Sequence, residues 1–107
     1  MKYQVLIIQE AEDDIFDNYR YILGHDTRES AGSVLEQLQE KIGKLREMPE
    51  WGHIPAELER IGITGYREVH FKPYRIIYEI DGKRVFVHAV LDGRRDLQSL
   101  LERRMYR

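Results

Sequence analysis

The 107-residue sequence contains no cysteine, only three prolines and no long hydrophobic run. The absence of cysteine excludes disulfide bonds and thiolate metal sites, and it fits a reducing, cytoplasmic compartment. No apolar stretch approaches the roughly 18 residues that a membrane span needs, so we expect no membrane partner. The apolar run within residues 2–8 is too short for a signal peptide. No linker rich in Pro, Gly or Ser interrupts the chain, which predicts one domain over residues 1–107.

Charged residues are abundant but unevenly distributed. Residues 1–62 hold 7 Lys/Arg and 13 Asp/Glu, a net charge of −6, whereas residues 63–107 hold 10 and 6, a net charge of +4. A basic half can attract a polyanion even when the whole chain is slightly acidic, because the field near a surface is set locally. The alternative is that these charges simply solvate the surface.

The first half of the sequence predicts a strand and then two helices. Residues 2–8 are almost wholly apolar, as in a strand buried on both sides. Residues 10–24 carry apolar side chains at helical spacing and acidic residues in the first turns, with Gly24 as a stop. Asp26 and Glu29 then form a capping box that begins a helix of about five turns, which Pro49 ends. So short a connection predicts an antiparallel helical hairpin. The second helix has apolar residues at steps of 4, 3, 4 and 3: Ala31, Leu35, Leu38, Ile42 and Leu45.

The second half predicts three strands and a final helix. Residues 49–65 are interpreted as an irregular connection. Residues 66–71 alternate, with Val69 and Phe71 on one face and Glu68 and His70 on the other. Residues 74–80 alternate as well, and the Asp81-Gly82 pair predicts a hairpin to a strand over 85–91. Asp96 is placed to cap a helix that carries Leu97, Leu100 and Leu101.

The resulting order, β-α-α-β-β-β-α, predicts an α+β fold. A mostly antiparallel sheet of about four strands carries the helical hairpin on one face. We expect the other face to be partly open and to present basic side chains of the last 45 residues to a macromolecular target.

Three segments carry a resemblance to a known family: GYREVHF at 65–71, PYRIIYE at 73–79 and GRRD at 93–96. With the first strand and the helical hairpin, they resemble the RelE/ParE superfamily toxins of type II toxin–antitoxin systems over essentially the whole chain. The resemblance implies a growth-inhibiting toxin of the plasmid-stabilisation kind. It also implies a cognate antitoxin as partner, whose disordered segment wraps the toxin and folds on binding.

RelE-like members cleave mRNA on the ribosome by activating the ribose 2′-hydroxyl against the adjacent phosphate. This reaction needs a base, cations that stabilise the developing negative charge, and an acid for the leaving oxygen. For a RelE-like chain the resemblance implies phosphate contacts by Arg75 and Arg95, because the planar guanidinium group grips phosphate oxygens. The catalytic set implied for that case is Glu68, His70, Arg75, Arg95 and Tyr106.

The match to this catalytic set is incomplete. Glu68 and His70 stand where RelE has lysines, and the position expected for the C-terminal tyrosine holds Leu101. The alternative is that Glu68 and His70 form an ordinary solvated or cross-strand pair. In the same alternative, the arginines form common surface pairs with Glu79 or Asp96.

ParE-like members instead poison DNA gyrase through binding, so they need no acid–base set. The Arg67-Glu68 pair, the Pro73-Tyr74-Arg75 run and the GRRD segment look closer to this branch, and we favour it. The target contacts implied are Arg67, Arg75, Arg94 and Arg95. A third possibility is a non-toxic member that only binds its antitoxin and represses their operon.

No cofactor and no metal are expected. Histidines 25, 53, 70 and 88 show no metal-ligand spacing along the chain. Trp51 and Tyr66 could stack on bases, but packing is the favoured role for Trp51. The basic residues of the C-terminal segment could touch nucleic acid or complement the dipole of the final helix, which we favour: Arg103, Arg104 and Arg107.

Overall fold

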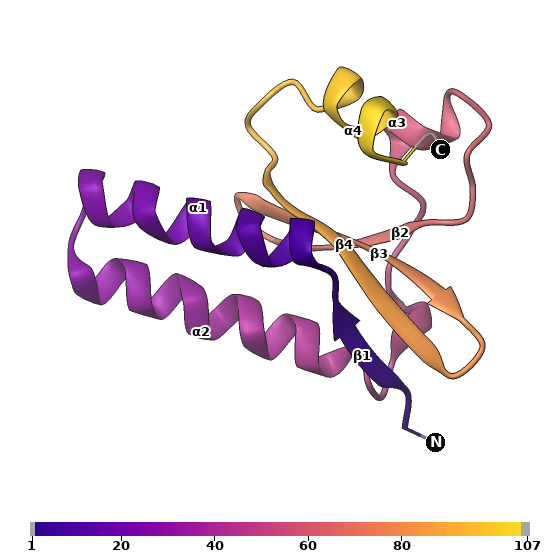
Figure 1. The fold of residues 1–107 in the computed structure, drawn as a ribbon, viewed down its shortest axis with the longest axis horizontal. Helices are drawn as coiled ribbons and strands as arrows, with labels where there is room; N and C mark the ends of the chain where they lie inside the picture. The colour runs from indigo at the N-terminus through magenta and orange to yellow at the C-terminus, as the bar shows by residue number, and fades with distance from the viewer. Residues whose placement is uncertain (1, 106–107) are drawn as a thin grey trace.

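A computed structural model describes residues 2–105 and places a four-stranded sheet between a long helical hairpin and two short helices (Figure 1). The strand order is β1-β4-β3-β2, with β1 parallel to β4 and the other neighbours antiparallel. The predicted α+β class is therefore confirmed. In chain order the elements are β1 (Gln4–Ile7), α1 (Gln9–His25), α2 (Arg28–Lys44), the 3₁₀ helix η1 (Pro49–Trp51), α3 (Ala56–Glu59), β2 (Arg67–Phe71), β3 (Tyr74–Asp81), β4 (Arg84–Asp92) and α4 (Gln98–Met105).

The helical hairpin of α1 and α2 forms where the apolar spacing places it, but its caps differ from the prediction. Helix α1 continues past Gly24 to His25, and the backbone N–H of Asp26 closes its last turn on Ile22 at 2.7 Å. The N-cap of α2 is Thr27, whose Oγ1 accepts the N–H of Ser30 at 3.0 Å. Asp26 instead accepts the N–H of Thr27. The capping box predicted at Asp26 and Glu29 is therefore wrong by one residue: the N-cap is Thr27, and threonine is also a favourable N-cap residue.

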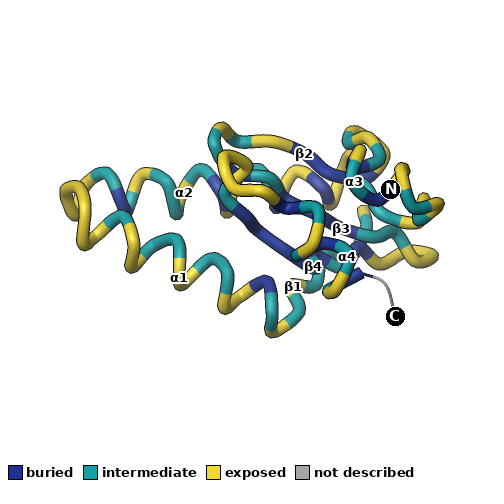
Figure 2. Tube along the Cα trace, turned by 90° about the horizontal axis from the view of Figure 1, so that it is seen from above, coloured by how far each residue is buried: buried dark blue, intermediate teal, exposed yellow. Residues whose placement is uncertain are grey.

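The first hydrophobic core lies between this hairpin and one face of the sheet. From α2 and its C-cap it receives Leu38, Ile42 and Leu45, and the strands contribute Ile76, Tyr78, Val85, Val87 and Val90. Figure 2 shows the buried parts of the chain concentrated in the central strands. Strand β1 lies at the edge of the sheet and leaves Ile7 exposed, so the expectation of a strand buried on both sides is wrong.

The opposite face of the sheet is covered by α3 and α4, which lie side by side over it (Figure 1). A second core results, built from Leu58, Ile77, Ala89, Leu91, Leu97, Leu101 and Met105. The prediction of a partly open face is therefore wrong over this region. None of the helices within residues 2–105 has the length and apolarity required to cross a membrane.

A β-bulge in β4 changes which of its residues face each core. Ile77 pairs with Ala89 but Tyr78 pairs with Val87, so β4 has one extra residue, His88, at that point. The extra residue reverses the alternation. Val87 therefore belongs to the first core, whereas Ala89 belongs to the second.

Truncation of Leu101 tests whether the second face is closed. Leu101 is fully buried in the second core, so Leu101→Ala should lower the free energy of unfolding by about 2–5 kcal/mol in urea denaturation. The matched control is Leu23→Ala at the exposed end of α1, which should cost less than about 1 kcal/mol. Equal, small effects of the two substitutions would contradict a closed second core.

Candidate functional site

A polar cluster centred on Arg75 occupies the second face of the sheet, beside the second core. Arg75 on β3 pairs directly with His70 on β2, and Glu68 lies two residues from His70. Because side chains alternate along a strand, all three project from the same face. The structure therefore brings Glu68, His70 and Arg75 together, as three members of the predicted catalytic set.

The guanidinium group of Arg75 is held between two carboxylates. It donates to Glu68 from Nε (2.6 Å) and Nη2 (2.9 Å), and to Glu57 from Nη1 (2.6 Å) and Nη2 (2.7 Å). These bonds use four of the five N–H donors that an arginine possesses. The side chain of Arg75 is only 15% exposed and that of Glu68 only 3%. Arg75 is thus committed to the protein itself.

This arrangement stabilises the ionised form of both carboxylates. Hydrogen bonds from Arg75 lower the pKa of Glu57 to about 2. Burial raises the pKa of Glu68, but hydrogen bonds from Arg75 and His70 outweigh burial and hold this pKa below its ordinary value. In return, the bond to Glu57 raises the pKa of Arg75 further. At neutral pH the three groups therefore form a charged triad with one cation and two anions.

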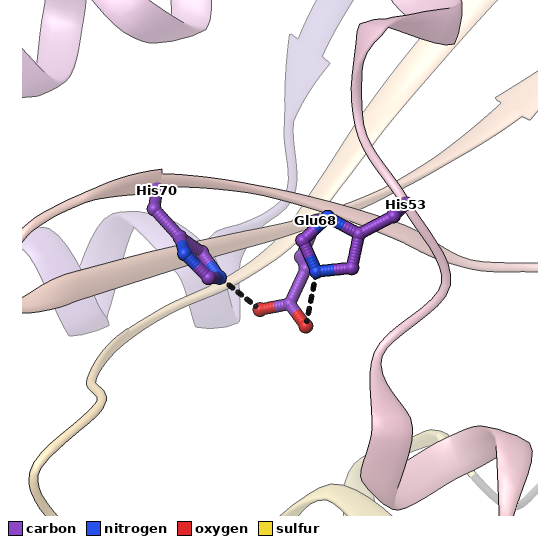
Figure 3. A group of neighbouring side chains, drawn as sticks. All are labelled: His53, Glu68 and His70. Atoms are coloured by element: carbon purple, nitrogen blue, oxygen red, sulfur yellow. Dashed lines mark hydrogen bonds and ion pairs between the residues drawn. The ribbon is translucent and has the colours of Figure 1, made fainter.

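Two imidazoles flank the buried carboxylate of Glu68 on its remaining side (Figure 3). Nε2 of His70 lies 2.9 Å from Oε1, and Nε2 of His53 lies 3.5 Å from Oε2. The two rings meet edge to face with centroids 5.4 Å apart. We call the five residues His53, Glu57, Glu68, His70 and Arg75 the Glu68 cluster.

His53 reaches this cluster because its segment is attached to the outer edge of β2. His53 and Glu68 exchange two backbone hydrogen bonds, of 3.1 and 2.7 Å. Gly52 allows this approach, since a Cβ there would lie 2.4 Å from the carbonyl oxygen of Glu68. The hydroxyl of Tyr78 accepts the N–H of Gly52 and donates to the carbonyl of Pro49.

Sequence reasoning missed His53 and Glu57, which both lie in the stretch interpreted as irregular. The one local signal was Pro55, because proline before a run of helix formers often begins a helix. Nothing in the sequence pairs Glu57 with Arg75. The proposed alternative partners of the arginines are also not used: Glu79 lies 2.9 Å from His88, and Asp96 caps the start of α4 by accepting the N–H of Gln98.

The other predicted site residues lie outside the cluster. Arg67 donates to the carbonyl oxygen of Gly52 at 2.9 Å, so its guanidinium helps to hold the segment that carries His53. Arg94 pairs with Asp92 at 2.7 Å, and both Arg94 and Arg95 are exposed on the turn after β4. Tyr106 falls outside the described residues.

Part of the basic charge of the second half is paired internally with acids of the first half. Arg75 binds Glu57, and Arg104 of α4 binds Asp14 of α1 at 2.9 Å, with both side chains mostly buried. The charge asymmetry seen in the sequence therefore contributes to joining distant segments. It supplies fewer cations to the surface than the count suggests.

Comparison with known proteins identifies the fold. One similar structure is the chromosomal ParDE toxin–antitoxin system from P. aeruginosa, with a TM-score of 0.70 and 15% identity over 83% of this chain and 94% of that one. The RelBE2 toxin–antitoxin complex from Mycobacterium tuberculosis has a TM-score of 0.57 and 20% identity over 84% and 96%. A mutant of the E. coli toxin RelE in the free state has a TM-score of 0.60 and 20% identity over 99% and 97%. No curated protein matches the chain.

The fold is thus that of the RelE/ParE superfamily of toxins. A family model described as the ParE toxin of the type II toxin–antitoxin system parDE matches residues 5–97. The chain belongs to this family of toxins, and the resemblance inferred from the sequence is confirmed.

The depressed pKa of Glu57 predicts a loss of stability in acid. The pKa is 4.5 for a free glutamate side chain and about 2 in the fold. The ionised group therefore contributes stability that is present above pH 4.5 and disappears as the pH falls through about 2. Glu57→Gln should reduce stability at pH 7 and flatten its decline between pH 5 and pH 2. Urea unfolding at a series of pH values measures both effects.

Glu59→Gln is the matched control for this prediction, because Glu59 ends the same short helix but is exposed. This control should retain the stability and the acid profile of the parent chain. A Glu57→Gln variant with an unchanged profile would contradict the strong pairing of Glu57 with Arg75.

Proposed function

We propose that this toxin arrests growth by binding and inhibiting DNA gyrase, as a ParE-like toxin, and that a cognate antitoxin neutralises it. The observation that carries the proposal is the double pairing of Arg75. This arginine matches the residue expected to bind phosphate in a RelE-like nuclease. Yet two edges of its guanidinium group are each occupied by a carboxylate.

A phosphate group is poorly accommodated at this position. To contact Arg75 it would have to displace Glu57 or Glu68, and it would then lie against the second carboxylate. A displaced carboxylate loses the partner that compensates its burial, and breaking a mostly buried ion pair is strongly destabilising. One N–H of Arg75 remains, which cannot form the bidentate grip that makes arginine effective towards phosphate.

Glu68 is likewise a poor general base for a ribose hydroxyl. A general base works best with a pKa near the operating pH, whereas Glu68 has a lowered pKa and is almost fully buried. Its oxygens already face Arg75, His70 and His53. These contacts favour a structural role over proton transfer.

The family match also favours gyrase inhibition over mRNA cleavage, because the matching model is that of ParE toxins and covers most of the chain. A toxin that acts by binding needs an accessible surface and no catalytic set. The turn after β4 offers two exposed cations, Arg94 and Arg95. We therefore assign the target contact to these two residues, and we withdraw Arg67 and Arg75 from that role.

The antitoxin partner is supported by the similar structures of toxin–antitoxin systems. The helical hairpin also provides an apolar surface that a folding segment could cover. A groove of about 480 Å³ is lined by Ile15, Phe16, Tyr19 and Leu35, among others, and Phe16 is exposed. A disordered partner that folds on binding can cover such a surface.

Two assays separate gyrase inhibition from mRNA cleavage. The purified toxin should inhibit DNA supercoiling by gyrase, and adding it to translating ribosomes should produce no codon-positioned cuts in mRNA mapped by primer extension. Cleavage of ribosome-bound mRNA with unaffected gyrase would instead establish the RelE-like alternative, for which the proximity of Glu68, His70 and Arg75 is the favouring observation. Growth without arrest upon induction would favour the non-toxic alternative.

Substitution of the two exposed arginines tests the assigned contact. Arg94→Ala combined with Arg95→Ala should raise the toxin concentration needed for half-inhibition of gyrase by about tenfold or more, as expected when contacts worth about 1.4 kcal/mol are lost. Arg84→Ala is the control, since Arg84 is exposed at the opposite end of β4. Undiminished inhibition by the double variant would remove the turn from the interface.

A further inference from the structure

His53, Glu68 and His70 place three potential metal-ligand atoms together on one face of the sheet. One nitrogen from each imidazole and one carboxylate oxygen lie within 4.8 Å of one another. The two histidines are 17 residues apart in the sequence, so spacing along the chain gives no sign of the site. Figure 3 shows both rings directed at the carboxylate from opposite sides.

The backbone fixes the geometry of this group. His53 and Glu68 are directly opposite each other in a bridge with two hydrogen bonds, and His70 follows Glu68 by two residues on β2. All three side chains therefore project from one face of the sheet, from backbone positions that are held in register. A site built on such elements is preorganised better than one built on a free loop.

Glu68 keeps capacity for another cation despite its bonds to Arg75. An ionised carboxylate has about four lone-pair positions on its two oxygens. Arg75 takes one position on each oxygen. The imidazoles of His70 and His53 face the remaining positions, so a metal ion between these rings would leave both contacts with Arg75 in place.

The local charge also favours a cation. Glu57 and Glu68 contribute two negative charges and Arg75 one positive charge, which leaves a net charge of −1 when both imidazoles are neutral. A neutral imidazole can bind a metal through Nε2 while Nδ1 carries the proton. The rings of His53 and His70 are 66% and 44% exposed, so an ion could reach them from solvent.

We propose that His53, Glu68 and His70 bind a divalent transition-metal ion of the zinc class. Two imidazole nitrogens and one carboxylate oxygen suit Zn²⁺ and its neighbours Co²⁺ and Ni²⁺, whereas Mg²⁺ and Ca²⁺ prefer oxygen ligands alone. Zinc bonds of about 2.0–2.2 Å in a tetrahedron separate the ligand atoms by roughly 3.3–3.6 Å. To reach this geometry, the His70 nitrogen, now 2.9 Å from the carboxylate, would move slightly outward and the two exposed imidazole rings would approach each other.

Three protein ligands leave at least one coordination position for water or another ligand, which distinguishes this site from a closed structural zinc site. Bound metal would link the segment that carries His53 to β2, and it would thereby hold the Glu68 cluster together. Metal that binds the folded chain raises its stability by mass action.

The test uses the untagged full-length protein, because a histidine tag would itself bind metal. Co²⁺ alone should bind with a stoichiometry of one, give a visible absorption band, and be displaced by Zn²⁺. Zn²⁺ should raise the midpoint of thermal unfolding, and Mg²⁺ at the same concentration should not. His53→Gln and His70→Gln should each weaken Co²⁺ binding by at least about tenfold, because ligand removal costs more than the loss of an outer-shell partner.

These variants should fold normally, since both rings are exposed and Glu68 retains Arg75; circular dichroism without metal checks this. His25→Gln is the matched control, because His25 is exposed at the far end of α1, where its ring stacks on Tyr21 and hydrogen-bonds the carbonyl of the same residue. It should bind Co²⁺ like the parent chain. Absence of Co²⁺ binding by the parent chain would overturn the proposal. Binding that survives both His53→Gln and His70→Gln would overturn it as well, because the metal would then lie elsewhere.

Discussion

The interaction on which the structure depends is the placement of one arginine between two carboxylates from different elements. Removing Arg75 from water is costly unless its charge is compensated, and Glu68 on β2 and Glu57 on α3 supply this compensation. Because Glu57 belongs to the short helix α3, the pairing also attaches this helix to the sheet. A helix of four residues has almost no stability of its own, so the ion pair and the buried Leu58 together explain why it forms there.

The same pairing is the basis of our proposal that this toxin acts by binding and not as a nuclease. An arginine that stabilises a developing negative charge must reach a phosphate oxygen, and four of the five N–H donors of Arg75 are bonded to Glu57 and Glu68. The pairing also explains the surroundings of Glu68. Its carboxylate remains ionised although it is buried, so the two imidazoles lie beside a fixed negative charge. The fold is thus shared with RelE-like toxins, whereas the electrostatics of the site favour a toxin that acts by binding.

The sequence predicted the elements that have a repeating pattern. The spacing of Leu38 and Ile42 located the second helix. The alternation in residues 74–80 placed the side chain of Arg75 on the other face of β3 from Tyr74 and Ile76. Features determined by single residues could not be predicted in this way. The bulge at His88 reverses the alternation of β4 without any local signal. Glu57 and His53 come from a stretch without periodicity, and their roles arise only from tertiary contacts with Arg75 and Glu68.

In solution, Glu57 and Glu68 should hold the Arg75 guanidinium and keep it unavailable to RNA. A ¹H–¹⁵N correlation NMR spectrum of the arginine side chains tests this directly. The Nε–H of Arg75 should give a distinct signal that exchanges slowly with water at pH 7 and does not move when a single-stranded RNA oligonucleotide is added. A rapidly exchanging signal that shifts upon addition of the RNA would contradict it.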